Sequence, residues 1–586
     1  MMFEYITNLE KAIESLSAFE KDKFVYLDTE VAVKDFDNID FYNDRVRLIQ
    51  IGNSEKIFLY DMFSIPEFSK YLKPFLEEKG IIGHNLKFDI KFLKSNFNIF
   101  PEVVFDTMIA SQLLSENPQK ERHSLSAVSY RFTENMIEKA YQKSSWDLKN
   151  LSKEQLKYAA EDIDVLRKIF PLLIEKLNSL PSPHKATGQI HKTFGLNNAV
   201  AAVEMGFVPF LSLIELIGMP IDKEKLEFVY KEKSSKYQKD YIEFVRKYGI
   251  DPFSSQKVAY WITSKLGLKL PKTQKGSLSS QDSALKPYID RPEIKTLLEI
   301  RKEKKLLDKL RELKEYEKKG RIYGEFKQIG APTGRMASLK PNLQNIPREL
   351  KFLFKAPEGK KLIVADYSQI ELRIAAEYVN EETMIKAFKE DKDLHRYTAS
   401  LILDKDYEAV TKEERQMAKA INFGLIYGIS PRSLMQYAKN NYGIDITLKE
   451  AERFHARFFD IYENFKQWHE KIKKELEKHR KLTVFSLLGR KMTVSRFTDA
   501  VNYPIQATGS DILKMAAVFF GRFAKEKNAF IVNLVHDEII VETKEDIAEE
   551  VKEILSKSMK NAGEILLKKV PIKYNMQIVD YWDEKE

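Results

Sequence analysis

Over roughly the first 180 residues, short apolar runs alternate with stretches whose apolar positions recur at the helical period. The runs that predict strands are FVYLDTE (24–30), RVRLIQIG (45–52), KIFLYDMF (56–63) and IIGHN (81–85). The last run leads into LKFDIKFLKSNF (86–97), an amphipathic sequence that predicts a helix. This alternation indicates an α/β domain. The segment LPSPHKATG (180–188) combines two prolines with a glycine, and it predicts a linker at the end of that domain.

The rest of the chain predicts helices and strands in separate blocks, a pattern typical of α+β structure. Residues from about 190 to 320 are mostly helical in pattern, and they end in a long amphipathic stretch with a dense basic face (299–320). Strand patterns return at RIYGEFKQ (321–328) and KLIVAD (361–366), before a helical block over about 380–480. Further strand patterns appear around FIVNLVHDEIIVE (530–542) and near the C-terminus. The basic helix is explained equally well by solvation and by a polyanionic partner.

Composition narrows the classes of protein. At 586 residues the chain is too long for one hydrophobic core, so several domains are expected. No apolar run is expected to span a membrane or to serve as a secretory signal. The sequence has no cysteine, which excludes disulfides and Cys-ligated zinc or iron–sulfur sites. A metal would therefore be held by oxygen ligands or histidine, and the net charge of +9 is compatible with a polyanionic partner.

Acidic residues recur in the N-terminal α/β part. Asp28 and Glu30 stand two residues apart at the predicted end of a strand, so both carboxylates point to one face. Asp89 lies on the helix after IIGHN, and Tyr158 and Asp162 are neighbours on one face of a later helix. Each acidic residue taken alone is better explained as a solvated surface group, and only the combination suggests a site.

The segments DTE, NLKFD and Y-x-x-x-D, in this order and spacing, resemble the three motifs of DEDD-type 3′–5′ exonucleases, in the subtype with tyrosine in the last motif. The resemblance covers about residues 1–180. It implies hydrolysis of a phosphodiester at two Mg²⁺ ions, with Mn²⁺ as the alternative ion. By the match, the metals would be held by Asp28, Glu30, Asp89 and Asp162, and Tyr158 would orient the attacking water.

A second acidic feature is LVHDEII (534–540), where His536, Asp537 and Glu538 interrupt an apolar run. A hairpin turn is one explanation, and a metal site on a rigid strand is another. The apolar strand LIVA delivers a further carboxylate, Asp366, to its own end. Two acidic strand features therefore stand far apart in the sequence.

Four residues spaced four apart lie between these features: Arg415, Lys419, Phe423 and Tyr427. On a helix they form one stripe, with two cations followed by two aromatic rings. Such a stripe suits a nucleotide, since cations face phosphates and rings lie near the base and sugar. A core-facing aromatic stripe with an unrelated basic end is the alternative.

The segments DYSQIELR, R-x-x-x-K-A-x-N-F-G-x-x-Y-G and VHDE, in this order, resemble motifs A, B and C of family A DNA polymerases, the bacterial DNA polymerase I group. TGRMAS, PNLQNIP, DLHRYTAS and NYPIQATGSD resemble that family too. The resemblance implies a multi-domain α/β and α+β fold, with a ribonuclease H-like exonuclease domain followed by a right-hand polymerase domain. The implied ranges are exonuclease 1–185, helical thumb 186–319, palm 320–380 with 497–586, and fingers 381–496.

The resemblance also implies roles for single residues. Asp366 and Asp537 would bind two Mg²⁺, with Glu538 as a supporting carboxylate, and Lys419 would also donate a proton to the leaving pyrophosphate. Glu371 would act as a steric gate against a ribose 2′-hydroxyl. The residues expected to bind the incoming nucleotide are Arg415, Lys419, Phe423, Tyr427, His395 and Glu371. The residues expected to contact DNA are Arg335, Gln506, Asn502 and His536.

Three functions are consistent with these patterns. The first is a DNA polymerase that extends a primer on a DNA template with dNTPs and proofreads it. The second is a nuclease whose C-terminal part only binds nucleic acid, and the third is a binding protein without enzymatic activity. The intact carboxylates and phosphate-facing cations favour the first.

The first function implies further expectations. The protein would be a monomer without membrane contact and would be cytoplasmic, of the bacterial, nucleoid-associated type, with an organelle as the alternative. The chain begins with the exonuclease motifs, so a separate 5′-nuclease or replication partner is expected. Thr498 stands where many relatives place an arginine, which puts one DNA contact in doubt.

Overall fold

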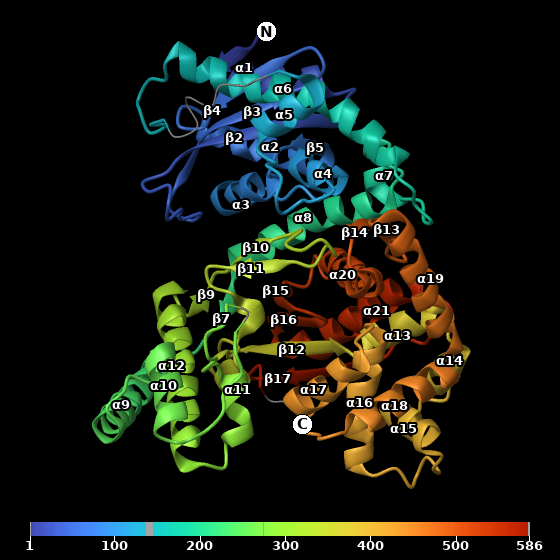
Figure 1. The fold of residues 1–586 in the computed structure, drawn as a ribbon. Helices are drawn as coiled ribbons and strands as arrows, with labels where there is room; N and C mark the ends of the chain where they lie inside the picture. The colour runs from blue at the N-terminus through green and yellow to red at the C-terminus, as the bar shows by residue number, and fades with distance from the viewer. Residues whose placement is uncertain (1, 136–143, 274, 584–586) are drawn as a thin grey trace.

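The computed structural model describes residues 2–135, 144–273 and 275–583. An N-terminal α/β domain lies above a larger C-terminal part, in which two groups of helices flank a central sheet (Figure 1). A single helix, α8 (Ala199–Ile217), lies between the two parts.

The N-terminal domain is built on a six-stranded mixed sheet of order β1-β4-β3-β2-β5-β6. Strand β2 pairs antiparallel with β3 and parallel with β5. The strands are β1 (Glu4–Ile6), β2 (Phe24–Ala32), β3 (Arg45–Gly52), β4 (Ile57–Asp61), β5 (Gly80–Gly83) and β6 (Val104–Asp106). The helices are α1 (Leu9–Ser15), α2 (Ser69–Glu78), α3 (Leu86–Phe97), α4 (Thr107–Leu114), α5 (Leu125–Thr133) and α6 (Lys153–Ser179). Apolar side chains of the sheet and helices form one core, as the alternating pattern predicts.

The C-terminal part is centred on an antiparallel sheet of order β15-β16-β12-β17. Its strands are β12 (Lys360–Tyr367), β15 (Phe530–Val535), β16 (Glu538–Lys544) and β17 (Tyr574–Val579). Helices α13 (Ile370–Val379), α20 (Phe497–Phe523) and α21 (Ala548–Leu566) contribute to the core on one face of this sheet. A second apolar cluster covers the other face, so β12 and β16 are buried on both sides.

Two helical groups flank this sheet on opposite sides (Figure 1). One comprises α9 (Lys223–Tyr248), α10 (Ser255–Ser264), α11 (Asp282–Leu285) and α12 (Pro292–Tyr316), with the short strands β7 (Met219–Pro220), β8 (Glu317–Lys318) and β9 (Arg321–Ile322) at its base. The other comprises α14 (Glu382–Lys389), α15 (Leu394–Leu403), α16 (Lys412–Ile426), α17 (Pro431–Tyr442), α18 (Leu448–Ile461) and α19 (Glu463–His479). The remaining elements are α7 (Gly188–Phe194) and the hairpins β10 (Glu325–Lys327) with β11 (Ala337–Leu339) and β13 (Leu482–Phe485) with β14 (Lys491–Val494).

Helix α8 corrects one expectation from the sequence. By length and composition it could cross a membrane, with a mean hydropathy of 1.9 over its most apolar window, and 78% of that window is buried inside the protein. Its apolar residues contribute to the cores of both the N-terminal and the C-terminal parts. Burial on all sides, rather than lipid contact, therefore accounts for its uniform apolarity.

Most predicted elements are confirmed, including the helix after IIGHN, the long basic helix and the hairpin at LVHDEII. Two details were wrong. Strand β2 does not end at Glu30 but continues to Ala32, past a β-bulge between Glu30 and Val31. Helix α16 ends at Ile426, so Tyr427 caps the helix instead of belonging to its last turn.

Candidate active sites

The first site is formed by one strand and one helix of the N-terminal domain. Asp28 and Glu30 project from β2, and Asp162 projects from α6. One carboxylate oxygen from each of the three lies within 4.8 Å of the others. Because alternate residues of a strand face the same side, the spacing in DTE delivers two ligands from one strand. Three oxygen donors at this separation suit a hard divalent cation.

Asp89 lies outside this three-carboxylate group, although the sequence placed it with the others. It projects from α3 and is buried, and the hydroxyl of Thr29 donates to it over 2.6 Å. Burial, together with the nearby charge of Asp106, raises the pKa of Asp89 to about 7. A nearby cation would favour its charged form.

Tyr158 lies one helical turn before Asp162 on α6, and its side chain is buried. Burial raises the pKa of the Tyr158 hydroxyl above its usual value, and the charges of Asp162 and Glu30 raise it further. The hydroxyl therefore stays protonated and can donate a hydrogen bond beside the carboxylates.

The second site is centred on the hairpin between β15 and β16. Val535 pairs with Glu538, which leaves His536 and Asp537 as a two-residue turn, and His536 has a φ of +56°. Strand β12 runs beside β16 so that Asp366 is opposite Glu538. Burial raises the pKa of Asp537 to about 7, and the nearby charge of Asp366 adds to this rise. The hairpin and the acidic site are therefore the same feature.

Glu538 is held by protein groups. The indole Nε1 of Trp582 donates to Oε1 of Glu538 over 2.6 Å, and Nζ of Lys351 lies 3.6 Å from the same oxygen. The sequence pattern did not single out Trp582 or Lys351. The ring of Trp582 is buried in the cluster beneath the sheet, but no motif marks it as a partner of Glu538.

The cations of the helical stripe lie on α16. Arg415 forms an ion pair with Asp393, with Nη2 and Oδ2 2.6 Å apart. Nζ of Lys419 lies 6.0 Å from the ring centre of Tyr442. Asp393 was missed by the sequence analysis, although it stands two residues before His395 in DLHRYTAS and caps α15.

His395 is buried behind this stripe. The side-chain amide of Asn422 donates to its Nδ1 over 3.1 Å, and the ring of Phe423 lies 5.7 Å away, centre to centre. Burial lowers the pKa of His395 to about 4. The imidazole is therefore neutral near pH 7, with Nε2 as its remaining donor.

A polar contact links three further predicted residues. Glu371, in the first turn of α13, accepts from the hydroxyl of Tyr427 and forms an ion pair with Arg335. On α20, the amide of Gln506 donates to Oδ1 of Asn502 over 2.8 Å.

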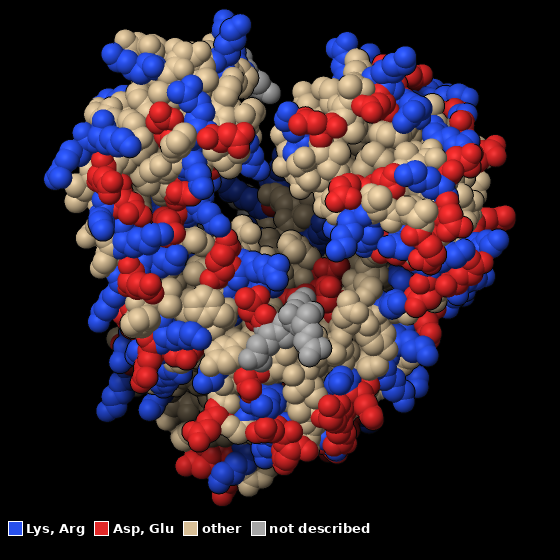
Figure 2. Space-filling model, turned by 90° about the horizontal axis from the view of Figure 1, so that it is seen from below, with Lys and Arg blue, Asp and Glu red and all other residues tan. Residues whose placement is uncertain are grey.

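Seen from below, a deep cleft separates the two helical lobes, and Lys and Arg side chains lie along its walls (Figure 2).

Comparison with known proteins identifies the family. The model of DNA polymerase family A matches residues 223–584, and that of a 3′–5′ exonuclease family matches residues 2–178. The chain belongs to DNA polymerase family A. It is 48% identical to DNA polymerase I of Aquifex aeolicus over 99% of this chain and 100% of that protein. It is 32% identical to the Borreliella burgdorferi enzyme over 98% of this chain and 64% of that one.

A solved structure supports the same fold for this family A polymerase. The polymerase domain of Pol1 from M. smegmatis, in complex with DNA primer-template and dNTP, aligns with a TM-score of 0.81 at 23% identity. The alignment covers 99% of both chains. These findings confirm the expected fold class and the first of the three functions. The chain is a DNA-directed DNA polymerase with 3′–5′ exonuclease activity that depends on divalent metal ions and acts in DNA replication or repair.

Proposed function

We propose that the two acidic sites are two separate two-metal centres that take Mg²⁺, one for exonuclease and one for polymerase chemistry. The observation that carries the proposal is the convergence of like charges at each site. Three carboxylates meet within 4.8 Å in the exonuclease domain, and Asp366 raises the pKa of Asp537 in the palm. Oxygen-only donor sets fit Mg²⁺, and Mn²⁺ accepts the same ligands. Bound there, the ions would supply Lewis-acid activation of the attacking oxygen and neutralise charge on the phosphate.

In the exonuclease site, Asp28, Glu30 and Asp162 hold the ions, and Asp89 completes the set from α3. The protonated hydroxyl of Tyr158 orients the attacking water. The hydroxyl is hydrogen-bonded to Asp162, which fixes it beside the carboxylates where the water would lie.

In the polymerase site, Asp366 and Asp537 are the ligands, and Glu538 supports Asp537 from the next position. The triphosphate is bound by Arg415, Lys419 and the Nε2–H of neutral His395, and Lys419 protonates the pyrophosphate as it leaves. Arg415 must exchange Asp393 for phosphate when a nucleotide binds, since the two form an ion pair in this structure.

The sugar of the nucleotide would lie against Phe423 and Glu371. The hydroxyl of Tyr427 donates to one carboxylate oxygen of Glu371. Held in this way, the carboxylate of Glu371 would fill the space that a ribose 2′-hydroxyl needs. Arg335, Gln506, Asn502 and His536 contact the primer–template. The first three read minor-groove acceptors that all base pairs share, which checks pair geometry without reading sequence.

The domain ranges given above remain part of the proposal, with one refinement. Helix α8 falls in the range assigned to the thumb but packs on the exonuclease and palm cores, so the thumb consists of α9 to α12. Its basic helix α12 would hold duplex phosphates. We also propose that the enzyme is a cytoplasmic monomer.

Calorimetric titration with Mn²⁺, used as a probe for both centres, tests the proposal. Compared with wild type, Asp28→Ala/Glu30→Ala is expected to lack one group of Mn²⁺-binding sites. Asp366→Ala is expected to lack a different group. Unchanged Mn²⁺ binding in either variant would contradict the assignment of that site.

A further inference from the structure

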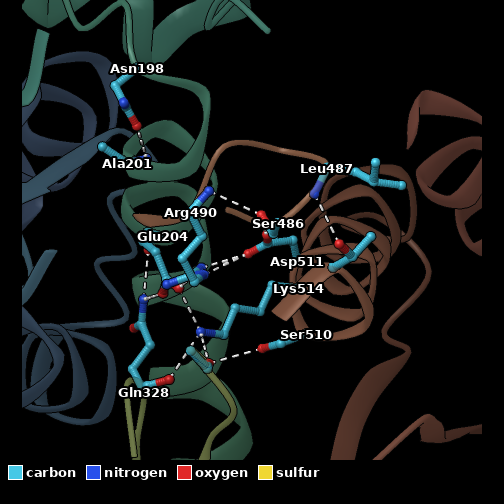
Figure 3. A network of polar contacts seen from close by, with 12 residues as sticks. Asn198, Ala201, Glu204, Gln328, Ser486, Leu487, Arg490, Ser510, Asp511 and Lys514 are labelled. Atoms are coloured by element: carbon cyan, nitrogen blue, oxygen red, sulfur yellow. Dashed lines mark hydrogen bonds and ion pairs between the residues drawn. The ribbon is translucent and has the colours of Figure 1, made fainter. Parts of the chain in front are cut away.

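A buried cluster of four charged side chains lies outside both active sites. Glu204 comes from α8, Arg490 from the turn between β13 and β14, and Asp511 and Lys514 from α20 (Figure 3). Nη2 of Arg490 lies 2.5 Å from Oε1 of Glu204 and 2.6 Å from Oδ1 of Asp511. Nζ of Lys514 lies 2.6 Å from the same Glu204 oxygen. Two anions and two cations balance each other, which allows all four to be buried.

The cluster holds the backbone carbonyls of Gln328 and Gly334, and Nζ of Lys514 donates to that of Gln328 over 3.0 Å. Nζ of Lys514 donates to the carbonyl oxygen of Gly334 over 2.7 Å, and the hydroxyl of Ser510 donates to the same oxygen over 2.9 Å. Gly334 has a φ of +76°, and a Cβ built on it would stand 2.5 Å from Cζ of Arg490. The guanidinium therefore packs directly on this glycine, which only a residue without a side chain permits.

Gly334 immediately precedes Arg335, whose guanidinium forms the ion pair with Glu371. The turn is closed by two further hydrogen bonds, in which the amides of Gly330 and Ala331 donate to the carbonyl of Arg335. A carbonyl held by two buried donors has little freedom to move, so the start of the Arg335 side chain is fixed relative to α20.

Helix α20 carries a stripe of polar residues along one side. Asn502, Gln506, Ser510 and Lys514 are spaced four residues apart and so lie along one side of the helix. The first two are proposed to contact the minor groove, and the last two hold Gly334. One side of α20 therefore bears two of the proposed DNA contacts. It also bears the two residues that hold Gly334, next to the third proposed contact, Arg335.

We propose that Lys514 and Ser510 are positioning residues for Arg335. By holding the carbonyl of Gly334, they set Arg335 in register with Asn502 and Gln506, and this register determines how strongly the enzyme rejects a mispaired primer end. The inference rests on the DNA contact proposed for Arg335.

The chain offers a matched control. Ser486 is also buried, and its hydroxyl donates to Oδ2 of Asp511 over 2.7 Å and accepts from the backbone N–H of Arg490 over 3.0 Å, in the same cluster but without a hydrogen bond to Gly334. Ser510→Ala and Ser486→Ala each remove one buried hydroxyl, and only Ser510→Ala loosens the carbonyl. A stronger variant, Glu204→Gln/Lys514→Met, removes one charge of each sign, so that Arg490 and Asp511 remain as a neutral pair.

The test measures single-nucleotide extension of paired and mispaired primer ends, with Asp28→Ala/Glu30→Ala as the background so that the exonuclease does not remove the mispair. Ser510→Ala and Glu204→Gln/Lys514→Met are expected to lower the paired-to-mispaired ratio of kcat/KM by about tenfold. Ser486→Ala is expected to leave the ratio within about twofold. In an Arg335→Ala background, Ser510→Ala should have no further effect, because both changes act through the same side chain.

The outcomes separate the two claims. Equal effects of Ser510→Ala and Ser486→Ala, or additive effects of Ser510→Ala and Arg335→Ala, would overturn the positioning role and leave the DNA contact of Arg335 intact. An unchanged ratio in Arg335→Ala alone would refute that contact, and the positioning role with it. The melting temperature of each serine variant is measured alongside, so that an effect of folding is distinguished from an effect of positioning.

Discussion

The two active sites differ in how their charged groups are arranged before substrate binds. In the exonuclease site, three carboxylates from one strand and one helix already converge within 4.8 Å. In the polymerase site, cations expected to meet the nucleotide or the DNA are paired with protein carboxylates, as in Arg415 with Asp393 and Arg335 with Glu371. On the proposed assignment, the exonuclease carboxylates are already placed to bind metal, whereas the polymerase site would exchange ion pairs when nucleotide and DNA bind.

This difference has a functional consequence. A site that must exchange partners can make the exchange depend on the shape of the incoming pair, because only a correct fit repays the broken ion pairs. A site that is already assembled cleaves whichever 3′ end reaches it. On the proposed assignment, we therefore expect selectivity at the polymerase site and non-selective hydrolysis at the exonuclease site.

Loss of the Lys419 charge should separate the sites most strongly. In Lys419→Met, extension is expected to fall by about 10²- to 10³-fold, since a phosphate contact and a proton donor are both lost. Primer shortening without dNTPs should be unchanged. Lys439→Met is the control, because Lys439 lies on the neighbouring helix α17 and pairs with Asp445. Equal losses of extension and shortening in Lys419→Met would contradict the separation.

Removal of the gate carboxylate should reduce selectivity more than rate. In Glu371→Ala, discrimination against ribonucleotides is expected to fall by about 10- to 100-fold, because space opens for the 2′-hydroxyl. Tyr427→Phe removes only the hydroxyl that donates to Glu371 and should have a smaller effect in the same direction. The measurement is the ratio of kcat/KM for dNTP and rNTP. Retained discrimination in Glu371→Ala would show that the gate lies elsewhere.

Loss of the hydrogen bond from Trp582 to Glu538 should have a smaller effect than either change above. Trp582→Phe keeps an aromatic ring but removes the N–H that donates to Glu538, and extension is expected to fall by about tenfold. Shortening should again be unaffected. Glu538→Gln provides the comparison, since it keeps the shape and removes the charge. If Trp582→Phe extends at the wild-type rate, Glu538 has no supporting role through this contact.

The smallest effect concerns pH. The pKa of His395 is lowered to about 4 by burial, so the ring is neutral from about pH 5 upward and binds phosphate without titrating. Between pH 5.5 and 8.5 the ratio of extension rates for wild type and His395→Gln should stay constant within about twofold. A tenfold change in that ratio near pH 6.5 would show that the protonated ring is the active form. By linkage, His395 lowers the free energy of unfolding as the pH falls from about 6.5 toward 4, because the unfolded chain binds the proton first.

Much of the fold could be predicted because it depends on local pattern. The spacing in DTE places two carboxylates on one face of β2, and the polar break in LVHDEII is consistent with the hairpin. The order of motifs, through the family resemblance, supplied the pairing of Asp366 with Asp537. The end of β2 was missed because a β-bulge lets a strand continue through a polar residue.

The sequence carried no signal for contacts made only in the folded chain. Glu204 and Lys514 are 310 positions apart, and a glutamate within an apolar helix has no local pattern that names its partner. The burial of α8 likewise depends on the two domains that pack against it. Its apolar sequence alone therefore could not predict which parts of the chain would cover it. Asp393 was overlooked for a different reason, since an N-cap aspartate is explained without any partner.

The most direct test of the two-site account is a primer-extension assay on a labelled primer–template with Mg²⁺, run with and without the four dNTPs. Wild type should extend the primer with dNTPs and shorten it without them. Asp366→Ala should only shorten it, and Asp28→Ala/Glu30→Ala should only extend it. A variant that loses both activities while keeping the wild-type melting temperature would contradict the claim that the two metal centres act separately.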